Sequence, residues 1–189
     1  DYINILTSLK LGIDNLDIEA IKTVYNGVLR DSANQFYDSK FDIAKLSNIK
    51  NDAIKSILSA KLLEAQNRGI SISVEIEPVS NFRIELLDFI TVLSVLCDNA
   101  IEATIKATSP RMTVVFINND DSLVLIVENS IKSEKVDVSH IFARGYSSKG
   151  EGRGLGLHNV NSILEKYPKS TITTRSANHL FSQTIRFCK

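Results

Sequence analysis

Several features that define other classes of protein are missing from this 189-residue sequence. It has only two cysteines, Cys97 and Cys188, which lie far apart without metal-ligand spacing around them, so neither a disulfide framework nor a cysteine metal site is expected. No run of about 18 or more apolar residues occurs, and the opening DYINILTSLK lacks the basic and apolar blocks of a signal peptide. We therefore expect a cytoplasmic chain, and a piece of a longer protein because it begins without Met inside a helical pattern.

An excess of charge of either sign is also missing. The 22 Lys and Arg residues balance 22 Asp and Glu residues, which argues against a partner recruited by overall charge, such as nucleic acid or an anionic membrane. Hydrophobic residues make up 43% of the sequence and charged residues 23%, which is ordinary globular usage, so we expect a packed core. The function must therefore be sought in local motifs.

The common nucleotide-binding signatures are absent as well. No GxxxxGK[ST] run occurs, and no GxGxxG follows a predicted strand. The HRD and DFG signatures of protein kinases are missing too. P-loop, dinucleotide-binding and protein-kinase folds are therefore not favoured.

The first 68 residues show the apolar spacing of packed helices. A stretch from Tyr2 and a second at residues 42–67, which Gly69 ends, each carry one apolar stripe. The stripes consist of Leu6, Leu9, Ile13, Leu16 and Ala20, and of Leu46, Ile49, Ala53, Ile57 and Ala60. We predict a helical hairpin that forms a dimeric four-helix bundle, since two such helices bury little surface alone. The alternative is a hairpin packed on its own second domain.

The remaining residues, 69–189, read as an α+β domain with strands and helices in separate layers. Ile70, Ile72, Val74 and Ile76 alternate with polar residues, as in a half-buried strand. Two hairpins and two helices follow. We predict helices at residues 88–104 and 155–167, and strand pairs at 113–117 with 123–127 and at 171–175 with 181–187.

The first of these helices carries a cluster of polar oxygens in the run LCDNAIEA. Asn99 falls on the same face as Val92, Val95, Leu96 and Ala103. Asp98 precedes it and Glu102 follows one turn later. A lone buried Asn is usually satisfied by the backbone, but oxygen groups clustered in this way suit Mg²⁺ and a triphosphate.

A second cluster is the run GEGRGLGL, with Gly150, Gly152, Gly154 and Gly156 just before a predicted helix. Glycines let backbone N–H groups approach an anion closely, and a helix begins with the positive end of its dipole. A surface loop entering a helix is the alternative, but four alternating glycines exceed what such a loop needs. We interpret this run as a phosphate cradle.

Two shorter segments complete the candidate site. Upstream of the glycines, IFARGYSSKGEGRG supplies Arg144, Lys149 and Arg153, the composition either of a mobile lid that meets phosphates or of a solvated basic loop. The run VENS leaves Glu128 and Asn129 at the end of an apolar strand. The amide of Asn129 either reads an adenine edge or starts a turn.

Taken in order, LCDNAIEA, VENS, IFARGYSSKG and GRGLGL resemble the N box, first glycine-region box, F box and second glycine box of the GHKL superfamily of ATP-binding domains. Within it the chain is similar to the ComD/AgrC-like histidine kinases, which are peptide-pheromone receptors in quorum sensing. Those kinases carry the phosphoacceptor in a His-Asp-Tyr-x-Asn motif. The chain opens with DYIN, so Asp1, Tyr2 and Asn4 match everything except the histidine.

This resemblance implies a Bergerat-type α/β sandwich over residues 69–189 that binds ATP and Mg²⁺. It implies that Asn99 holds Mg²⁺, Asn129 lies at the adenine pocket and Phe142 packs the lid. The other nucleotide-site residues that it indicates are Asp98, Glu102, Lys149, Gly150, Gly152, Arg153, Gly154, Leu155 and Gly156.

The resemblance also implies that residues 1–68 are the dimerisation and histidine-phosphotransfer helices. The phosphoryl group of ATP would pass to the histidine before Asp1, which Asp1 would orient, and then to a response regulator docked on the hairpin. The intact protein would be a membrane receptor, attached through segments outside this chain. His140, His158 and His179 are poor substitutes for the acceptor, and we interpret all three as structural.

The sequence departs from the superfamily pattern at two positions. Asn129 stands in ENS where most histidine kinases have Asp in DxGxG. Val95 stands where the ATPases of the superfamily place a water-activating Glu, which disfavours an ATPase of the gyrase or mismatch-repair type. Two further functions stay open, a non-catalytic ATP sensor and an anti-sigma-type serine kinase, although the single domain of the latter would leave the hairpin unexplained.

Overall fold

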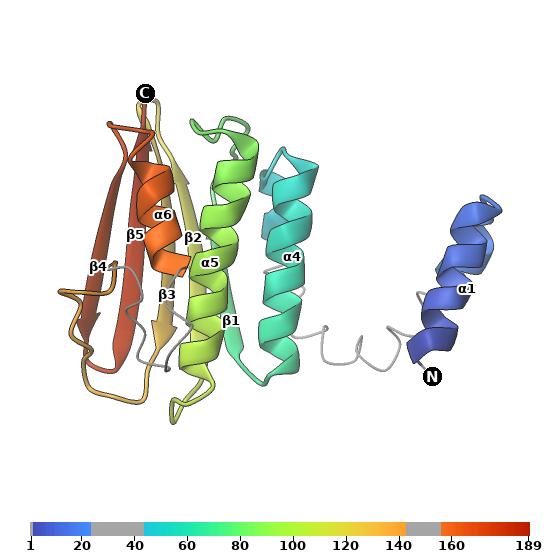
Figure 1. The fold of residues 1–189 in the computed structure, drawn as a ribbon, viewed down its shortest axis with the longest axis horizontal. Helices are drawn as coiled ribbons and strands as arrows, with labels where there is room; N and C mark the ends of the chain where they lie inside the picture. Colours follow the sequence, from blue (N-terminus) through green and yellow to red (C-terminus); the bar gives the residue numbers. More distant parts are fainter. Residues whose placement is uncertain (1, 24–43, 143–155) are drawn as a thin grey trace. The chain divides into compact units, whose positions relative to one another are not determined.

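The computed structural model describes residues 2–23, 44–142 and 156–189 (Figure 1). The chain divides into two compact units, Asp1–Phe41 and Asp42–Lys189. Within the described ranges, no helix combines the length and the apolar composition that a membrane span requires.

The N-terminal unit begins with helix α1 (Tyr2–Asp14), which ends earlier than the predicted apolar stripe. Leu16 adopts a left-handed conformation with φ of 53°, and the N–H of Asp17 donates to the carbonyl of Gly12 at 2.8 Å. This is the Schellman pattern that terminates helices. Asp17 then caps the next helical turn by accepting from the N–H of Ala20 at 3.0 Å. The prediction of one helix through Leu16 and Ala20 is therefore wrong.

The helix predicted at residues 42–67 is also interrupted. A 3₁₀ turn, η2 (Leu46–Asn48), leads to Ile49, which forms an isolated parallel bridge with Val79. Helix α4 (Asp52–Asn67) begins only after Asn51, whose side chain caps it. The stretch reads as one helix because its apolar spacing continues through Ile49, but the backbone there is extended.

Helix α4 packs within the second unit. Its buried residues join the same core as the strands and comprise Ile54, Leu58, Leu62 and Ala65. The compact units divide after Phe41, and the functional domain boundary predicted after residue 68 stays a prediction. The helical hairpin predicted for residues 1–68 stays a prediction. An apolar stripe shows that some other surface covers a helix, but it does not identify that surface.

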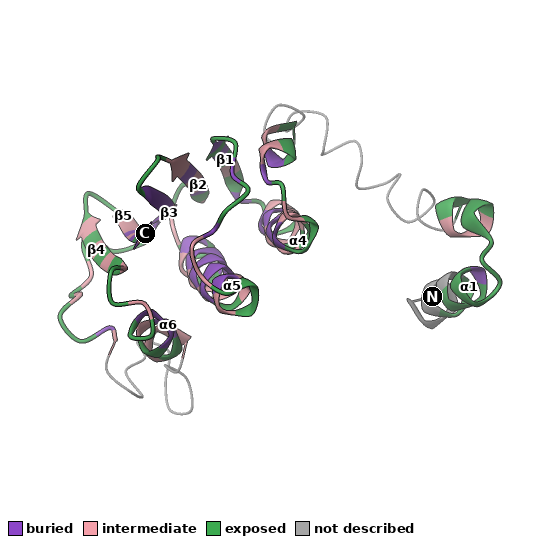
Figure 2. Ribbon diagram, turned by 90° about the horizontal axis from the view of Figure 1, so that it is seen from above, coloured by how far each residue is buried: buried purple, intermediate pink, exposed green. Residues whose placement is uncertain are grey.

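The second unit is a two-layer α/β sandwich, which confirms the predicted separation of strands and helices (Figures 1 and 2). Its five-stranded sheet has the order β1-β2-β3-β5-β4, in which only β1 and β2 pair in parallel. The strands are β1 (Ser71–Ile76), β2 (Arg111–Asn118), β3 (Ser122–Ser130), β4 (Thr171–Ala177) and β5 (Leu180–Cys188). One face of the sheet is covered by α4, α5 (Leu86–Thr104) and α6 (Gly156–Leu164).

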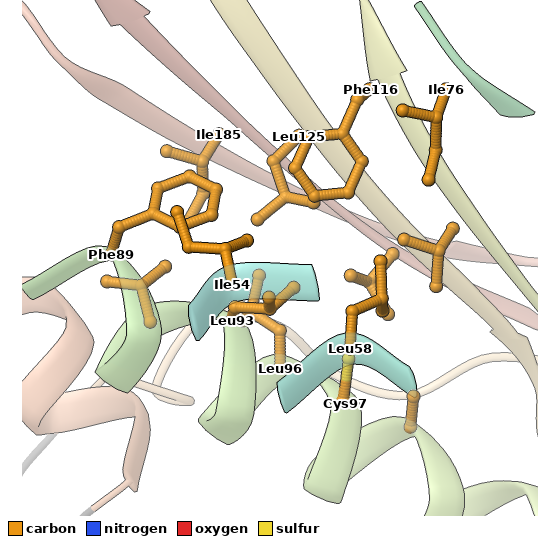
Figure 3. Close-up of a cluster of buried hydrophobic side chains, with 14 of the residues drawn as sticks. Ile54, Leu58, Ile76, Phe89, Leu93, Leu96, Cys97, Phe116, Leu125 and Ile185 are labelled. Atoms are coloured by element: carbon orange, nitrogen blue, oxygen red, sulfur yellow. The ribbon is translucent and has the colours of Figure 1, made fainter. Parts of the chain in front are cut away.

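Helix α5 provides the centre of the core. Phe89 is fully buried, and its ring centroid lies 4.7 Å from that of Phe82, 6.1 Å from Phe116 and 5.6 Å from Phe187. Figure 3 shows further side chains of α5 among those of the sheet. Because aromatic rings at these separations pack edge to face or offset, Phe89 fixes both the height and the rotation of α5 on the sheet.

The buried thiol of Cys97 gives a direct test of this packing. Burial raises its pKa to about 12, and the neighbouring Asp98 carboxylate adds to the shift. Because the thiolate is the reactive form, we expect iodoacetamide at about pH 8 to leave Cys97 unmodified while it alkylates the half-buried Cys188. Peptide mass spectrometry measures both sites. Equal labelling in guanidinium is the control, and equal labelling of the native chain would contradict a closed core.

Candidate functional site

The candidate site lies along one flank of α5. Val95, Asn99 and Ala103 form a row of half-buried side chains, each four residues from the last. The neighbouring Leu96 and Ala100 are buried in the core. Asn99 thus lies at the margin of the core face, where a polar side chain remains accessible. Its carboxamide makes no hydrogen bond with any residue in the described ranges.

Helix α6 begins against this row. A Cβ atom added at Gly156, the first residue of α6, would lie 3.1 Å from Cγ1 of Val95. That separation is tighter than ordinary packing, so the absence of a side chain lets the start of α6 approach α5 one turn before Asn99. A helix N-terminus carries partial positive charge on its unpaired N–H groups. The start of α6 therefore brings N–H groups that can bind an anion close to the uncharged side-chain oxygen of Asn99.

Asn129 is a strand residue and not the start of a turn. It is 2% exposed near the end of β3, paired with Met112 on one side and Phe181 on the other. Its Nδ2 donates to the carbonyl of Ser130 at 2.9 Å, and Oγ1 of Thr104 donates to the same carbonyl at 3.0 Å. The end of β3 is thereby tied to the end of α5.

Asp98 does not join Asn99 on the same side of α5. Its Oδ1 accepts a hydrogen bond from Nζ of Lys61, on α4, at 2.5 Å. Consecutive helical residues point about 100° apart, which explains why the two side chains separate. Glu102 is exposed. Among the described residues no group of three His, Cys, Asp or Glu side chains is arranged to hold a metal ion. The predicted oxygen cluster includes the amide of Asn99, which is not one of these residue types, so it stays a prediction.

The segment after β3 is anchored to the β4–β5 turn. Asn178 and His179 have φ values of 52° and 61°, and this two-residue turn confirms the hairpin predicted around Asn178. The N–H of His179 donates to Glu134 at 2.8 Å, and its carbonyl accepts from Ile131 at 2.8 Å. These backbone contacts tie His179 to the segment after β3, and the structural role of its side chain stays a prediction. The segment then leads to Phe142, which is half-buried.

The other predicted histidines and site residues divide between described and undescribed parts of the chain. His140 is exposed and His158 is half-buried. Several predicted site residues lie outside the described residues, namely Asp1, Arg144, Lys149, Gly150, Gly152, Arg153, Gly154 and Leu155.

A polar clamp between α5 and α6 was missed from the sequence. Oη of Tyr167 donates to Oδ2 of Asp88 at 2.7 Å and accepts from the N–H of Glu85 at 3.1 Å. Nζ of Lys166 lies 3.2 Å from Oδ1 of Asp88. The clamp ties the residues after α6 to the first turn of α5, so it helps to fix where α6 begins. An acidic residue such as Asp88 is common in the first turn of a helix, but the sequence does not indicate which residue it contacts.

The clamp predicts a pH-dependent contribution to stability. The hydrogen bond from Tyr167 is the main reason that the pKa of Asp88 is lowered, and Lys166 adds to it. A lowered carboxyl pKa stabilises the fold above the unfolded value, and this stabilisation disappears as pH falls through the folded value. We expect Tyr167→Phe to lower the free energy of unfolding by about 1–2 kcal/mol at neutral pH, and by less below about pH 4.

Urea unfolding across this pH range measures the difference between Tyr167→Phe and wild type. Asp88→Asn and the double variant complete a mutant cycle that isolates the pair. A difference that stays constant with pH would show that Tyr167 contributes packing alone.

Comparison with known proteins is consistent with this geometry. The sequence profile described as "GHKL domain" matches residues 84–188. The chain is 29% identical over 169 residues to Sensor protein CitS of Bacillus subtilis, covering 86% of this chain and 29% of that protein. It is 28% identical over 174 residues to Sensor histidine kinase DcuS of Escherichia coli K12, covering 89% and 31%. The chain thus spans less than a third of the length of either relative.

Solved structures show the same fold. The catalytic domain of histidine kinase ThkA superposes with a TM-score of 0.61 at 20% identity, covering 74% of this chain and 93% of that one. Acinetobacter baumannii histidine kinase AdeS gives a TM-score of 0.57 at 17% identity, covering 98% and 94%. At these identities the likeness concerns the fold alone.

Proposed function

This chain belongs to the GHKL domain family, and from that premise we propose that it is the ATP-binding kinase core of a two-component sensor histidine kinase. The observation that carries the proposal is the approach of α6 to α5. The start of α6 lies against Val95, one turn from the accessible amide of Asn99. The relatives named as sensor kinases support the same assignment.

The described residues fit a magnesium nucleotide. The half-buried Asn99 offers an uncharged oxygen to Mg²⁺, and the phosphates themselves would supply further oxygen ligands. A bound Mg²⁺ would neutralise part of the phosphate charge. Backbone N–H groups at Gly156 would face the phosphates, Asn129 would lie toward the adenine, and Phe142 would begin the lid. Glu102 lies one turn beyond Asn99.

The remaining contacts come from the predicted lid and glycine run. Lys149 and Arg153 would pair with phosphate oxygens, because their cations match the charge of the triphosphate. Gly150, Gly152, Gly154 and Leu155 would offer backbone N–H groups to the same oxygens.

The reaction proposed is phosphoryl transfer from ATP to a histidine that precedes Asp1. The bond from the γ-phosphorus to the bridging oxygen breaks, a phosphorus–nitrogen bond forms, ADP leaves and the imidazole loses a proton. Asp1 orients that histidine or accepts its proton. Catalysis comes mainly from positioning and charge neutralisation. An aspartate of a response regulator then receives the phosphoryl group.

The pheromone-receptor branch is the finer part of the proposal. It is supported by the opening DYIN and by ENS at Glu128 and Asn129. In that case the chain is the cytoplasmic part of a membrane receptor for quorum sensing.

Hydrolysis of ATP is not favoured. An ATPase of this superfamily needs a carboxylate to activate water one turn before Asn99, and Val95 occupies that position. In the structure Val95 packs against the start of α6. An ATP sensor without phosphoryl transfer and an anti-sigma-type serine kinase are the remaining alternatives. Restoring a histidine before Asp1 and following label from γ-labelled ATP separates the histidine kinase from both, because only the histidine kinase labels that histidine.

Nucleotide binding tests the proposed site. We expect Asn99→Ala to weaken binding of a non-hydrolysable Mg-ATP analogue by about tenfold or more, because it removes the metal ligand. Isothermal titration calorimetry measures the dissociation constants. Asn67→Ala, the same change at the exposed end of α4, is the matched control and should bind like wild type. Absence of binding to folded wild type at millimolar nucleotide would overturn the proposed function.

The N-terminal unit supports a homodimer. Leu11, Ile13, Leu16 and Ile18 are large apolar residues that are each 56% to 86% exposed, and so many exposed apolar side chains in one short segment favour a partner that covers them. We expect Leu11→Glu with Ile13→Glu to convert a dimer to a monomer in light scattering. Leu87→Glu is the matched control, since Leu87 is 77% exposed in the second unit. A wild type that is monomeric at high concentration would contradict the dimer.

A further inference from the structure

An ion pair joins α4 to α5 beside the candidate metal ligand. Nζ of Lys61 lies 2.5 Å from Oδ1 of Asp98 and 3.9 Å from Oε2 of Glu64. The side chain of Lys61 is 22% exposed and that of Asp98 is 45% exposed. The two helices lie side by side on the same face of the sheet (Figures 1 and 2). The pair therefore sits at a helix–helix contact that water only partly reaches.

Lys61 keeps its charge in this setting. Burial by itself lowers the pKa of an ammonium, but the hydrogen bond and charge of Asp98 outweigh that effect, and Glu64 assists them, so the pKa of Lys61 is raised. Lys61 therefore carries its positive charge at neutral pH. A partly exposed ion pair adds little to the stability of the fold. The main effect of this pair is on the local electrostatic field.

That field acts on Asn99, which follows Asp98 in the sequence. Two neighbouring residues of a helix lie well within the Debye length of about 8 Å at physiological salt, so little screening separates them. An unpaired carboxylate at Asp98 would repel a triphosphate carrying about four negative charges, and its oxygens would compete for the metal. Lys61 cancels this charge and turns the carboxylate toward α4.

The position of Lys61 is itself fixed by the segment before α4. Nζ of Lys45 donates to the carbonyl of Val74 at 2.8 Å, and Nδ2 of Asn48 donates to that of Ile76 at 2.7 Å. Both carbonyls belong to β1, so the segment is held on the edge of the sheet. The start of α4 is thereby anchored, and Lys61 follows about two and a half turns later.

We propose that Lys61 is a positioning residue for the nucleotide site. By pairing with Asp98 it keeps that carboxylate from repelling the phosphates and from competing with the neutral amide of Asn99 for the metal. This inference rests on the proposed function. It gives Asp98 an indirect role, in contrast to the direct nucleotide contact predicted for it from the sequence.

The test is calorimetric titration of the whole chain with a non-hydrolysable ATP analogue, with Mg²⁺ and separately with EDTA. In Lys61→Met the freed carboxylate repels the metal-free nucleotide more than the magnesium complex. We expect its dissociation constant to rise about fivefold without Mg²⁺ and about twofold or less with it. Lys61→Arg keeps the pair and should resemble wild type. Lys61→Met with Asp98→Asn removes both charges and should restore binding.

A matched control separates charge from folding. Lys55→Met removes another lysine pair of α4, Lys55 with Asp52 at 3.2 Å, and should leave both constants unchanged. Circular dichroism confirms that each variant is folded. Equal binding by Lys61→Met and wild type overturns the inference, and so does a loss that the double variant fails to restore. Wild type that binds no nucleotide overturns the proposed function instead, and the inference with it.

Discussion

The burial of one face of α5 against the sheet is the constraint on which the rest of this structure depends. Phe89 meets the rings of Phe82, Phe116 and Phe187, and the next two turns place Leu93 and Leu96 in the same core. Each such side chain contributes about 1.5–3 kcal/mol when fully buried. This contribution fixes the rotation of α5, because turning the helix would expose the whole face.

Once α5 is fixed, several of its other positions have set neighbours. Val95 meets Gly156 and thereby places the start of α6. Asp98 meets Lys61 of α4, and Asp88 meets Tyr167 after α6. The candidate site is therefore the part of α5 that neither the core nor α4 occupies. Its chemistry follows from packing, since Asn99 stays accessible only because the core face ends beside it.

The N-terminal part of the chain shows the limits of periodicity. The apolar spacing at residues 2–20 continued through Leu16, yet the chain breaks there in a left-handed turn. The spacing at residues 42–67 predicts either half of a dimeric hairpin or a helix packed on the second domain, and α4 packs on α5 and β1. An apolar stripe shows only that some apolar surface lies opposite the helix, and it does not identify the partner.

Local spacing and local backbone preference encode the strands and helices of residues 69–189, the separation of layers and the motifs at Asn99, Asn129 and Gly156. Tertiary packing, in contrast, places Asp98 against α4 and brings Tyr167 to Asp88. These contacts join residues 37 and 79 positions apart. No periodic pattern encodes such pairs, because they form only when the burial of α5 brings three separate helices together.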